Sequence, residues 1–302
     1  MLDFSWLWAV FTLLAAAGQT ARNAMQRELT ASLGTVGATH VRFLFGFPFA
    51  LVFLAGVALA TGSALPRPGL VFVPWILLGA LAQIAATALM LAAMSQRSFV
   101  VTVAYIKTEP VQVAVFGLIF LGDPVTAPMM AAIVIATLGV VVMSFKPGAG
   151  ASGGMRPTLV GLAAGGMFAL SAIGYRGAIL IVSPTSNFVM AATFTLAVGL
   201  VLQAVLLTLY LALYDRKVLS DIMRLWRPSL LAGFMGATAS QFWFLAFALA
   251  TAASVRTLAL VEVLFAQAIS AFIFRQKTSA REAIGIVMIV LGVVLLIWSH
   301  PT

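Results

Sequence analysis

The chain has 302 residues, of which 63% are hydrophobic and 8% are charged. A soluble domain carries roughly 25% charged residues, so this composition excludes an ordinary soluble protein and indicates an integral membrane protein. With no cysteine and two histidines far apart in sequence, the chain offers no disulfide framework and no metal-ligand pattern, and we expect neither a metal nor a cofactor. The net charge of +9 comes from residues in short loops between apolar runs, so we expect no nucleic-acid partner.

A membrane-spanning helix needs roughly 20 mostly apolar residues. Breaking the chain at charges, prolines and polar clusters predicts ten such helices. They run over 4–28, 34–60, 70–95, 98–121, 126–145, 158–181, 186–213, 228–250, 253–274 and 280–299. The first lacks the basic start and cleavage site of a signal peptide and is read as a mature helix. The polar loop 215–228 is predicted to hold a short helix at the membrane surface, over 219–226.

Two stretches of the chain, 102–143 and 255–296, align without a gap at a fixed offset of 153 residues. Each places one acid, Glu109 or Glu262, in the middle of an otherwise apolar segment, and each continues to a Leu-Gly-Val-Val run. We therefore expect two five-helix repeats, residues 1–146 and 158–302, joined by a linker at 147–157. Because five is odd, the second copy enters the membrane from the opposite side, so the fold class is an all-α membrane protein built from two inverted repeats around a central cavity.

Loop charge predicts the orientation of the chain in the membrane. Eleven basic residues, among them Lys146, Arg216 and Arg281, fall on one side of the predicted helices, and only Arg67 clearly falls on the other. The positive-inside rule then places the eleven in the cytoplasm and both termini in the periplasm. The expected location is the bacterial inner membrane, which the chain crosses several times.

Polar side chains within the predicted helices are the candidates for a substrate site. A charge in the middle of the bilayer costs about 2.5–3.5 kcal/mol, so such residues face partners or a watery cavity. The candidate substrate-binding residues lie on helices 1, 3, 4, 6, 8 and 9 and are Gln19, Arg22, Asn23, Gln83, Tyr105, Glu109, Tyr175, Arg176, Gln241, Trp243 and Glu262. Spacings of three and four place the candidates of helix 1 on one face, and likewise those of helix 4.

The sequence allows two roles for several of these residues. Arg22 and Arg176 either neutralise Glu109 and Glu262 or contact the substrate directly, and Gln83 either belongs to the site or bridges neighbouring helices. Two further arginines, Arg42 and Arg256, lie near predicted helix ends, where we expect them to extend toward the membrane surface.

Helix 4 also contains a lysine and a proline beside its acid. Lys107 lies about 160° from Glu109 in a regular helix, so we do not expect these two to pair. Pro110 removes a backbone donor and is predicted to kink the helix at this point.

The chain resembles the EamA-type branch of the drug/metabolite transporter superfamily. The resemblance rests on the run Tyr105 to Val111 (Y-I-K-T-E-P-V), on Leu121-Gly122-Asp123 and on the helix with Leu138-Gly139. Helix 9 repeats the pattern less fully, with Val263 where the family usually has proline and Arg275-Gln276 in place of the Gly-acid pair. Within the superfamily the chain is similar to bacterial YddG-like exporters. Family members commonly keep their termini in the cytoplasm, whereas the loop charges here favour the opposite orientation.

The resemblance implies a transporter and not an enzyme. The leading hypothesis is export of amino acids, aromatic and other neutral ones, and related small metabolites by alternating access. Glu109 and Arg22, with Glu262 and Arg176, would hold the charged ends of the zwitterion. We expect a monomer whose partners are the lipid bilayer and the small-molecule substrate.

Two alternatives remain open. The first is proton-coupled efflux of drugs or other cations, in which a buried glutamate exchanges a proton for a cation. The second, more distant, is an intramembrane enzyme, for which His40 is the only histidine expected within the membrane.

Overall fold

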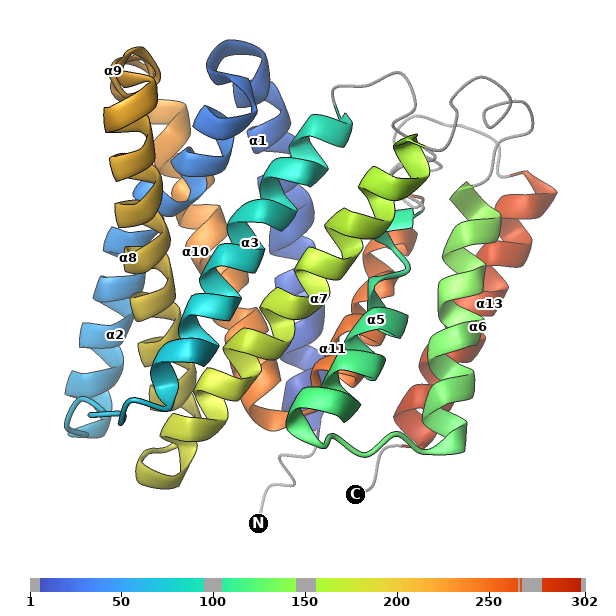
Figure 1. The fold of residues 1–302 in the computed structure, drawn as a ribbon. Helices are drawn as coiled ribbons and strands as arrows, with labels where there is room; N and C mark the ends of the chain where they lie inside the picture. The colour runs from blue at the N-terminus through green and yellow to red at the C-terminus, as the bar shows by residue number, and fades with distance from the viewer. Residues whose placement is uncertain (1–5, 95–104, 145–155, 266, 268–278, 300–302) are drawn as a thin grey trace.

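The computed structural model describes residues 6–94, 105–144, 156–265, 267 and 279–299. Within these residues all regular structure is helical (Figure 1). The elements are α1 Leu7–Leu44, α2 Phe47–Thr61, α3 Phe72–Met94, α5 Glu109–Phe116, the π-helical turn η2 Gly117–Leu121, α6 Ala127–Ser144, α7 Arg156–Val182, the 3-10 turn η3 Ser183–Thr185, α8 Phe188–Tyr214, α9 Arg216–Arg224, α10 Trp226–Leu249, α11 Ala252–Leu258, the 3-10 turn η4 Ala259–Val261 and α13 Ala280–Trp298.

Six helical stretches among the described residues are long and apolar enough to cross a membrane, and the apolar helices Glu109–Leu121 and Ala127–Met143 are shorter. The expectation of an all-helical membrane protein is therefore confirmed, whereas the count of ten spanning helices is not.

The first helix contains a sharp bend. Gly34 has φ 67° and ψ 178° in the middle of α1, a conformation that L residues with a side chain rarely adopt. The chain rises through the first arm of α1, reverses near Gly34 and descends through the second arm into α2 (Figure 1). The predicted break between residues 28 and 34 thus corresponds to the kink at Gly34, which separates two helices within α1.

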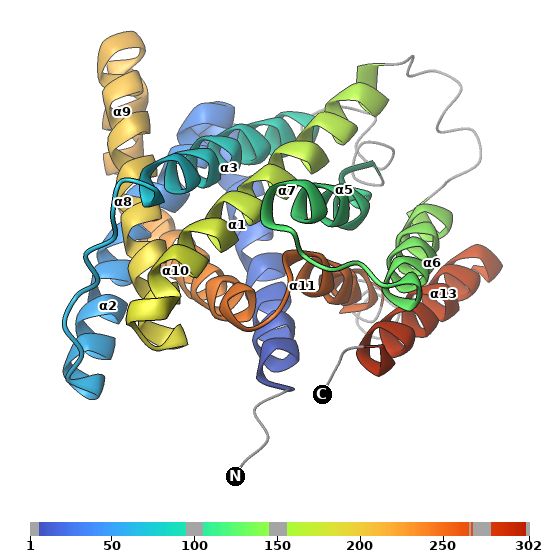
Figure 2. The same ribbon diagram turned by 60° about the horizontal axis from the view of Figure 1, so that its bottom comes forward.

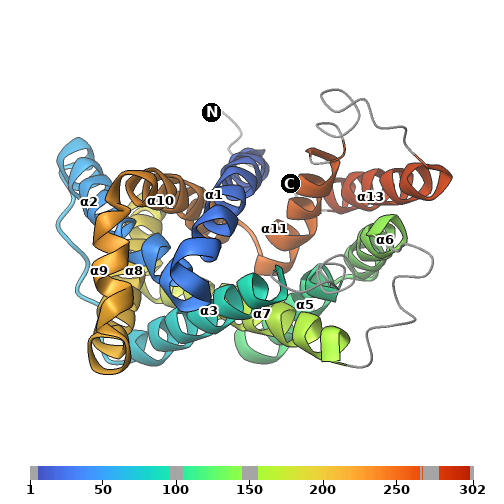
Figure 3. The ribbon, with the colours of Figure 1, turned by 90° about the horizontal axis from the view of Figure 1, so that it is seen from above.

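Three pairs of helices make the most extensive contacts in the bundle: α3 with α7, α1 with α10, and α6 with α13. The backbones approach closely at glycines. A Cβ on Gly174 would lie 2.4 Å from the backbone nitrogen of Gly79, and a Cβ on Gly139 would lie 2.8 Å from the carbonyl oxygen of Gly285. Small residues allow such approach in membranes, where helices associate through packing because lipid is as apolar as their side chains. Seen from above, α6 and α13 lie at one side of the bundle, and α2 and α8 lie at the other (Figure 3).

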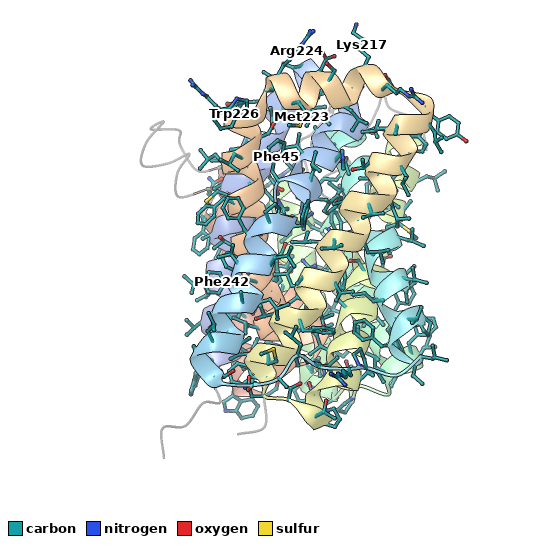
Figure 4. The ribbon with its side chains drawn as sticks, turned by 90° about the vertical axis from the view of Figure 1, so that its left-hand side faces the viewer. Phe45, Lys217, Met223, Arg224, Trp226 and Phe242 are labelled. Carbon is teal, nitrogen blue, oxygen red and sulfur yellow. The ribbon has the colours of Figure 1, made fainter. Side chains whose placement is uncertain are left out.

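The two ends of the bundle differ in character. The short helix α9 lies across one end, where Lys217, Met223, Arg224 and Trp226 point outward (Figure 4). The Asp215 side chain accepts a hydrogen bond from the Val218 backbone N–H and so caps the start of this helix. The start of α1, the end of α13 and the loop between α2 and α3 lie at the opposite end (Figure 1).

The two ends can be assigned to membrane faces by cysteine labelling, because the chain has no cysteine of its own. Gly69→Cys places a thiol in the exposed loop between α2 and α3, and Lys217→Cys places one on α9. We expect an impermeant maleimide to label Gly69→Cys in whole cells and to label Lys217→Cys only after permeabilisation, because the basic end should face the cytoplasm. If only Lys217→Cys is labelled in whole cells, the chain has the opposite orientation in the membrane, and the description of the fold is unaffected.

The contact between α3 and α7 can be tested by adding one methyl group. Gly174→Ala should lower stability by about 1–3 kcal/mol, because its Cβ meets backbone that cannot move aside. The matched control is Gly56→Ala in α2, where nothing lies within 4 Å of the new Cβ and alanine favours the helix. Thermal unfolding in detergent should show a lower midpoint for the first variant alone.

Candidate functional site

Two helices are interrupted directly before a glutamate that faces into the bundle. On the N-terminal side of α5 the helix opens into a turn at Lys107 and Thr108 and resumes at Glu109, with Pro110 in the first turn. The α11 helix passes into η4 over Ala259–Val261 directly before Glu262. The two interruptions correspond at the offset of 153 residues, although the second has no proline. Interrupted helices in transporters free backbone groups to line a substrate or ion site.

Two ion pairs cross between the interrupted segments, which lie side by side (Figure 2). Lys107 Nζ pairs with the Glu262 carboxylate. Arg256 Nε lies 3.1 Å from Oε1 of Glu109, although the N–H is not directed along a hydrogen bond. Each glutamate is therefore neutralised by a cation from the other interrupted helix. The expectation that Arg256 extends to the membrane surface is wrong, since the residue is 8% exposed and pairs inside the bundle.

Two candidate residues join these ion pairs in one polar network. Trp243 Nε1 donates a hydrogen bond to Gln19 Oε1 at 3.1 Å, and Gln19 Nε2 donates to Glu262 Oε2 at 3.2 Å. The Arg256 guanidinium carbon lies 4.5 Å from the centre of the Trp243 ring, within the range of a cation–π interaction. Helices α1, α10, α5 and α11 thus meet at a single charged and aromatic cluster.

Arg176 belongs to a separate group. Its Nε and Nη2 donate to the two carboxylate oxygens of Asp123, each at 3.2 Å, and Nη1 donates to the carbonyl oxygens of Phe247 and Ala250. Four acceptor atoms from three residues bind this guanidinium, which connects the segment after η2 to the end of α10. Sequence analysis named Asp123 only within the Leu121-Gly122-Asp123 motif and did not anticipate that it would neutralise Arg176.

A buried cavity lies between α1, α3, α7, α8 and α10, and it has room for about one water molecule. Its polar lining comes from Arg42, Gln83, Tyr175, Gln203 and Ser240. Arg42 Nη1 and Nη2 donate to Thr87 and Ser240, both at 3.3 Å, and the residue is 5% exposed. The prediction that Arg42 reaches the membrane surface is therefore wrong as well.

The cavity unites two residues predicted for the site with one that was missed. Gln83 accepts a hydrogen bond from Ser171 at 2.8 Å, and the Tyr175 ring packs against Phe244 at 4.6 Å between centroids. Gln203 donates to the Ala80 carbonyl at 3.2 Å. The sequence feature that could have identified Gln203 is that it is the one amide side chain in the apolar segment that forms α8.

Arg22 lies on the first arm of α1, is 1% exposed, and has no acidic partner among the residues that the structure describes. Its Nη2 donates to Asn23 Oδ1 at 2.8 Å, while its Nε and Nη1 have no hydrogen-bond partner. Tyr105 is half-buried at the start of the interrupted helix, and Gln241 donates to Thr193 on α8 at 2.8 Å.

The charge pairing differs from the one expected. Neither Arg22 nor Arg176 neutralises Glu109 or Glu262; Arg256 and Lys107 do so. Lys107 does not pair with Glu109, as expected, but the turn before α5 lets it reach Glu262, which follows η4. Single-helix geometry could not reveal this contact, because it depends on how the two interrupted segments are placed against each other.

Comparison with known proteins supports a transporter. Residues 6–145 match the EamA-like transporter family, which suggests a membrane transporter of small molecules and not an enzyme. The chain shares its fold with a protein of known crystal structure at a TM-score of 0.68, with 16% sequence identity over 96% of this chain and 94% of that one. No curated protein matches the chain. The narrower likeness to YddG-like exporters is not confirmed.

The ion pair between Glu109 and Arg256 can be measured with a double-mutant cycle. Glu109→Gln should lower stability by about 3–5 kcal/mol, because it leaves the buried Arg256 without its counter-charge. Glu109→Gln combined with Arg256→Gln should recover part of the loss in thermal unfolding. Arg224→Gln is the control, because its pair with Asp221 is at the surface and is worth no more than about 1 kcal/mol. Additive losses in the double variant would show that the two charges do not interact.

Proposed function

We propose that the chain is a secondary transporter that exports amino acids and related small metabolites by alternating access. The observation that carries this proposal is the pair of interrupted helices whose glutamates are neutralised across the halves. These ion pairs hold the two proposed halves together. If the charges separated or exchanged partners, one half would be free to move relative to the other.

The helix contacts support a two-repeat mechanism. If residues 1–146 and 158–302 are inverted repeats, α3 in one copy corresponds to α10 in the other, and the first arm of α1 corresponds to α7. The extensive contact of α3 with α7 then has its counterpart in the contact of α10 with α1, and the α6–α13 contact corresponds to itself. This reciprocity is what a two-fold axis in the membrane plane requires, and it favours rocking of one repeat against the other.

The charge arrangement gives less support to the two alternatives. Proton-coupled cation efflux needs an acid that is free to exchange a proton for a cation, yet Glu109, Asp123 and Glu262 each lie beside a basic partner. For an intramembrane enzyme, His40 Nε2 lies 3.0 Å from Thr208 Oγ1, so its polar contact is with a threonine on α8.

Uptake into proteoliposomes tests the proposed function. We expect the protein to move labelled phenylalanine and leucine at comparable rates, and to move methyl viologen poorly, with and without a pH gradient. The double variant Glu109→Gln/Glu262→Gln should reduce uptake at least tenfold, while Arg67→Gln in the exposed loop should leave it unchanged. Strong uptake of methyl viologen driven by a pH gradient, with no amino-acid transport, would establish cation efflux instead.

A further inference from the structure

The bundle interior carries more positive than negative charge. Five basic side chains lie within the described helices and their interruptions: Arg22, Arg42, Lys107, Arg176 and Arg256. Glu109, Asp123 and Glu262 are their acidic counterparts, and each pairs with one of them. The two cations without an acidic partner are Arg22 and Arg42. Isolated charges are costly in a low-dielectric interior, so a pair of them calls for an anion.

The two arginines lie on either side of the same glycine. A Cβ on Gly236 of α10 would lie 3.3 Å from Cγ of Arg42 and 3.4 Å from Cδ of Arg22. Arg22 comes from the first arm of α1 and Arg42 from the second, so the bend at Gly34 brings them to one place. The small residue on α10 leaves room for both side chains to extend into the bundle.

Unused hydrogen-bond donors are available at this place. Arg22 Nε and Nη1 and Arg42 Nε are buried and have no partner. The other nitrogens of Arg42 make long contacts with the neutral hydroxyls of Thr87 and Ser240. Nε and Nη form the planar fork with which a guanidinium binds a carboxylate through two parallel hydrogen bonds.

We propose that Arg22 and Arg42 form a binding site for the carboxylate of the transported molecule, and that the carboxylate, not an amine, is the group recognised. This inference rests on the proposed transport function and specifies its substrate class as organic acids, with or without an amino group. A bound carboxylate offsets the repulsion between the two arginines and occupies their free donors. An amine finds no comparable partner, because each of the three buried acids of the described bundle is held by a cation.

Binding to the purified protein in detergent tests the site. The probes are phenylpyruvate, phenylalanine and phenethylamine, which share a phenyl side chain and carry a carboxylate alone, a carboxylate with an amine, and an amine alone. Calorimetry should show that phenylpyruvate binds at least as tightly as phenylalanine and that phenethylamine does not bind. Arg22→Gln and Arg42→Gln should each weaken phenylpyruvate binding about 10- to 100-fold, the effect of losing hydrogen bonds to a charged group.

A stability readout separates a binding role from a structural one. Removing either charge relieves repulsion in the ligand-free protein, so Arg22→Gln should unfold at the same temperature as the wild type or higher. Arg176→Gln should unfold at a lower temperature, because the substitution removes the charge that pairs with Asp123 and the hydrogen bonds to two backbone carbonyls. Arg67→Gln is the neutral control for both measurements.

Three outcomes would overturn the site. They are tighter binding of phenethylamine than of phenylpyruvate, unchanged phenylpyruvate binding in both arginine variants, and failure of the wild type to bind either carboxylate. If the protein still transports phenylalanine or leucine in proteoliposomes, the proposed transport function survives any of these results. If it transports none of the uptake panel while phenylpyruvate binding depends on Arg22, the site stands and the proposed function fails.

Discussion

The cost of holding charge inside an apolar bundle governs how this protein is assembled. A buried acid is tolerated only beside a cation or strong hydrogen-bond donors, and each partner here comes from a different helix. Glu109 requires Arg256, Glu262 requires Lys107, and Asp123 requires Arg176. These pairs connect helices that lipid-facing side chains alone would not orient, because apolar residues have no preference between lipid and one another. Charge pairing therefore connects the interrupted segments and the loop after η2 to the bundle, whereas the three most extensive helix contacts depend on close packing at small residues.

The interrupted helices relate this constraint to movement. A continuous helix satisfies its own backbone and behaves as a rigid rod, whereas a turn within it leaves a place where direction can change at low cost. Both interruptions lie immediately before the glutamates, so any reorientation of these segments also moves the charges. Arg176 and Asp123 are different, because the arginine also bonds two carbonyls at the end of α10 and holds that end fixed. The bundle thus combines a tightly bonded arginine with a charged region at two interrupted helices.

The sequence anticipated the parts of this structure that depend on local chemistry. Runs of apolar residues located most helices, and Pro110 marked the first interruption. The second interruption, before Glu262, was not predicted, although it lies at the equivalent position of the 153-residue offset. Sequence analysis also identified Gln19, Trp243 and Glu262 as candidates, and the structure joins them through hydrogen bonds. It failed where partners depend on three-dimensional placement. Arg42 and Arg256 were expected near the membrane surface because helix ends were estimated from composition, and the bend at Gly34 and the position of α11 bury both.

The cavity lined by Arg42, Gln83 and Tyr175 has room for about one water molecule. A chamber of this size admits neither a hydrated ion nor a file of connected waters along which protons could pass. At this place between α3, α7, α8 and α10, the described helices therefore leave ions no route through the bundle.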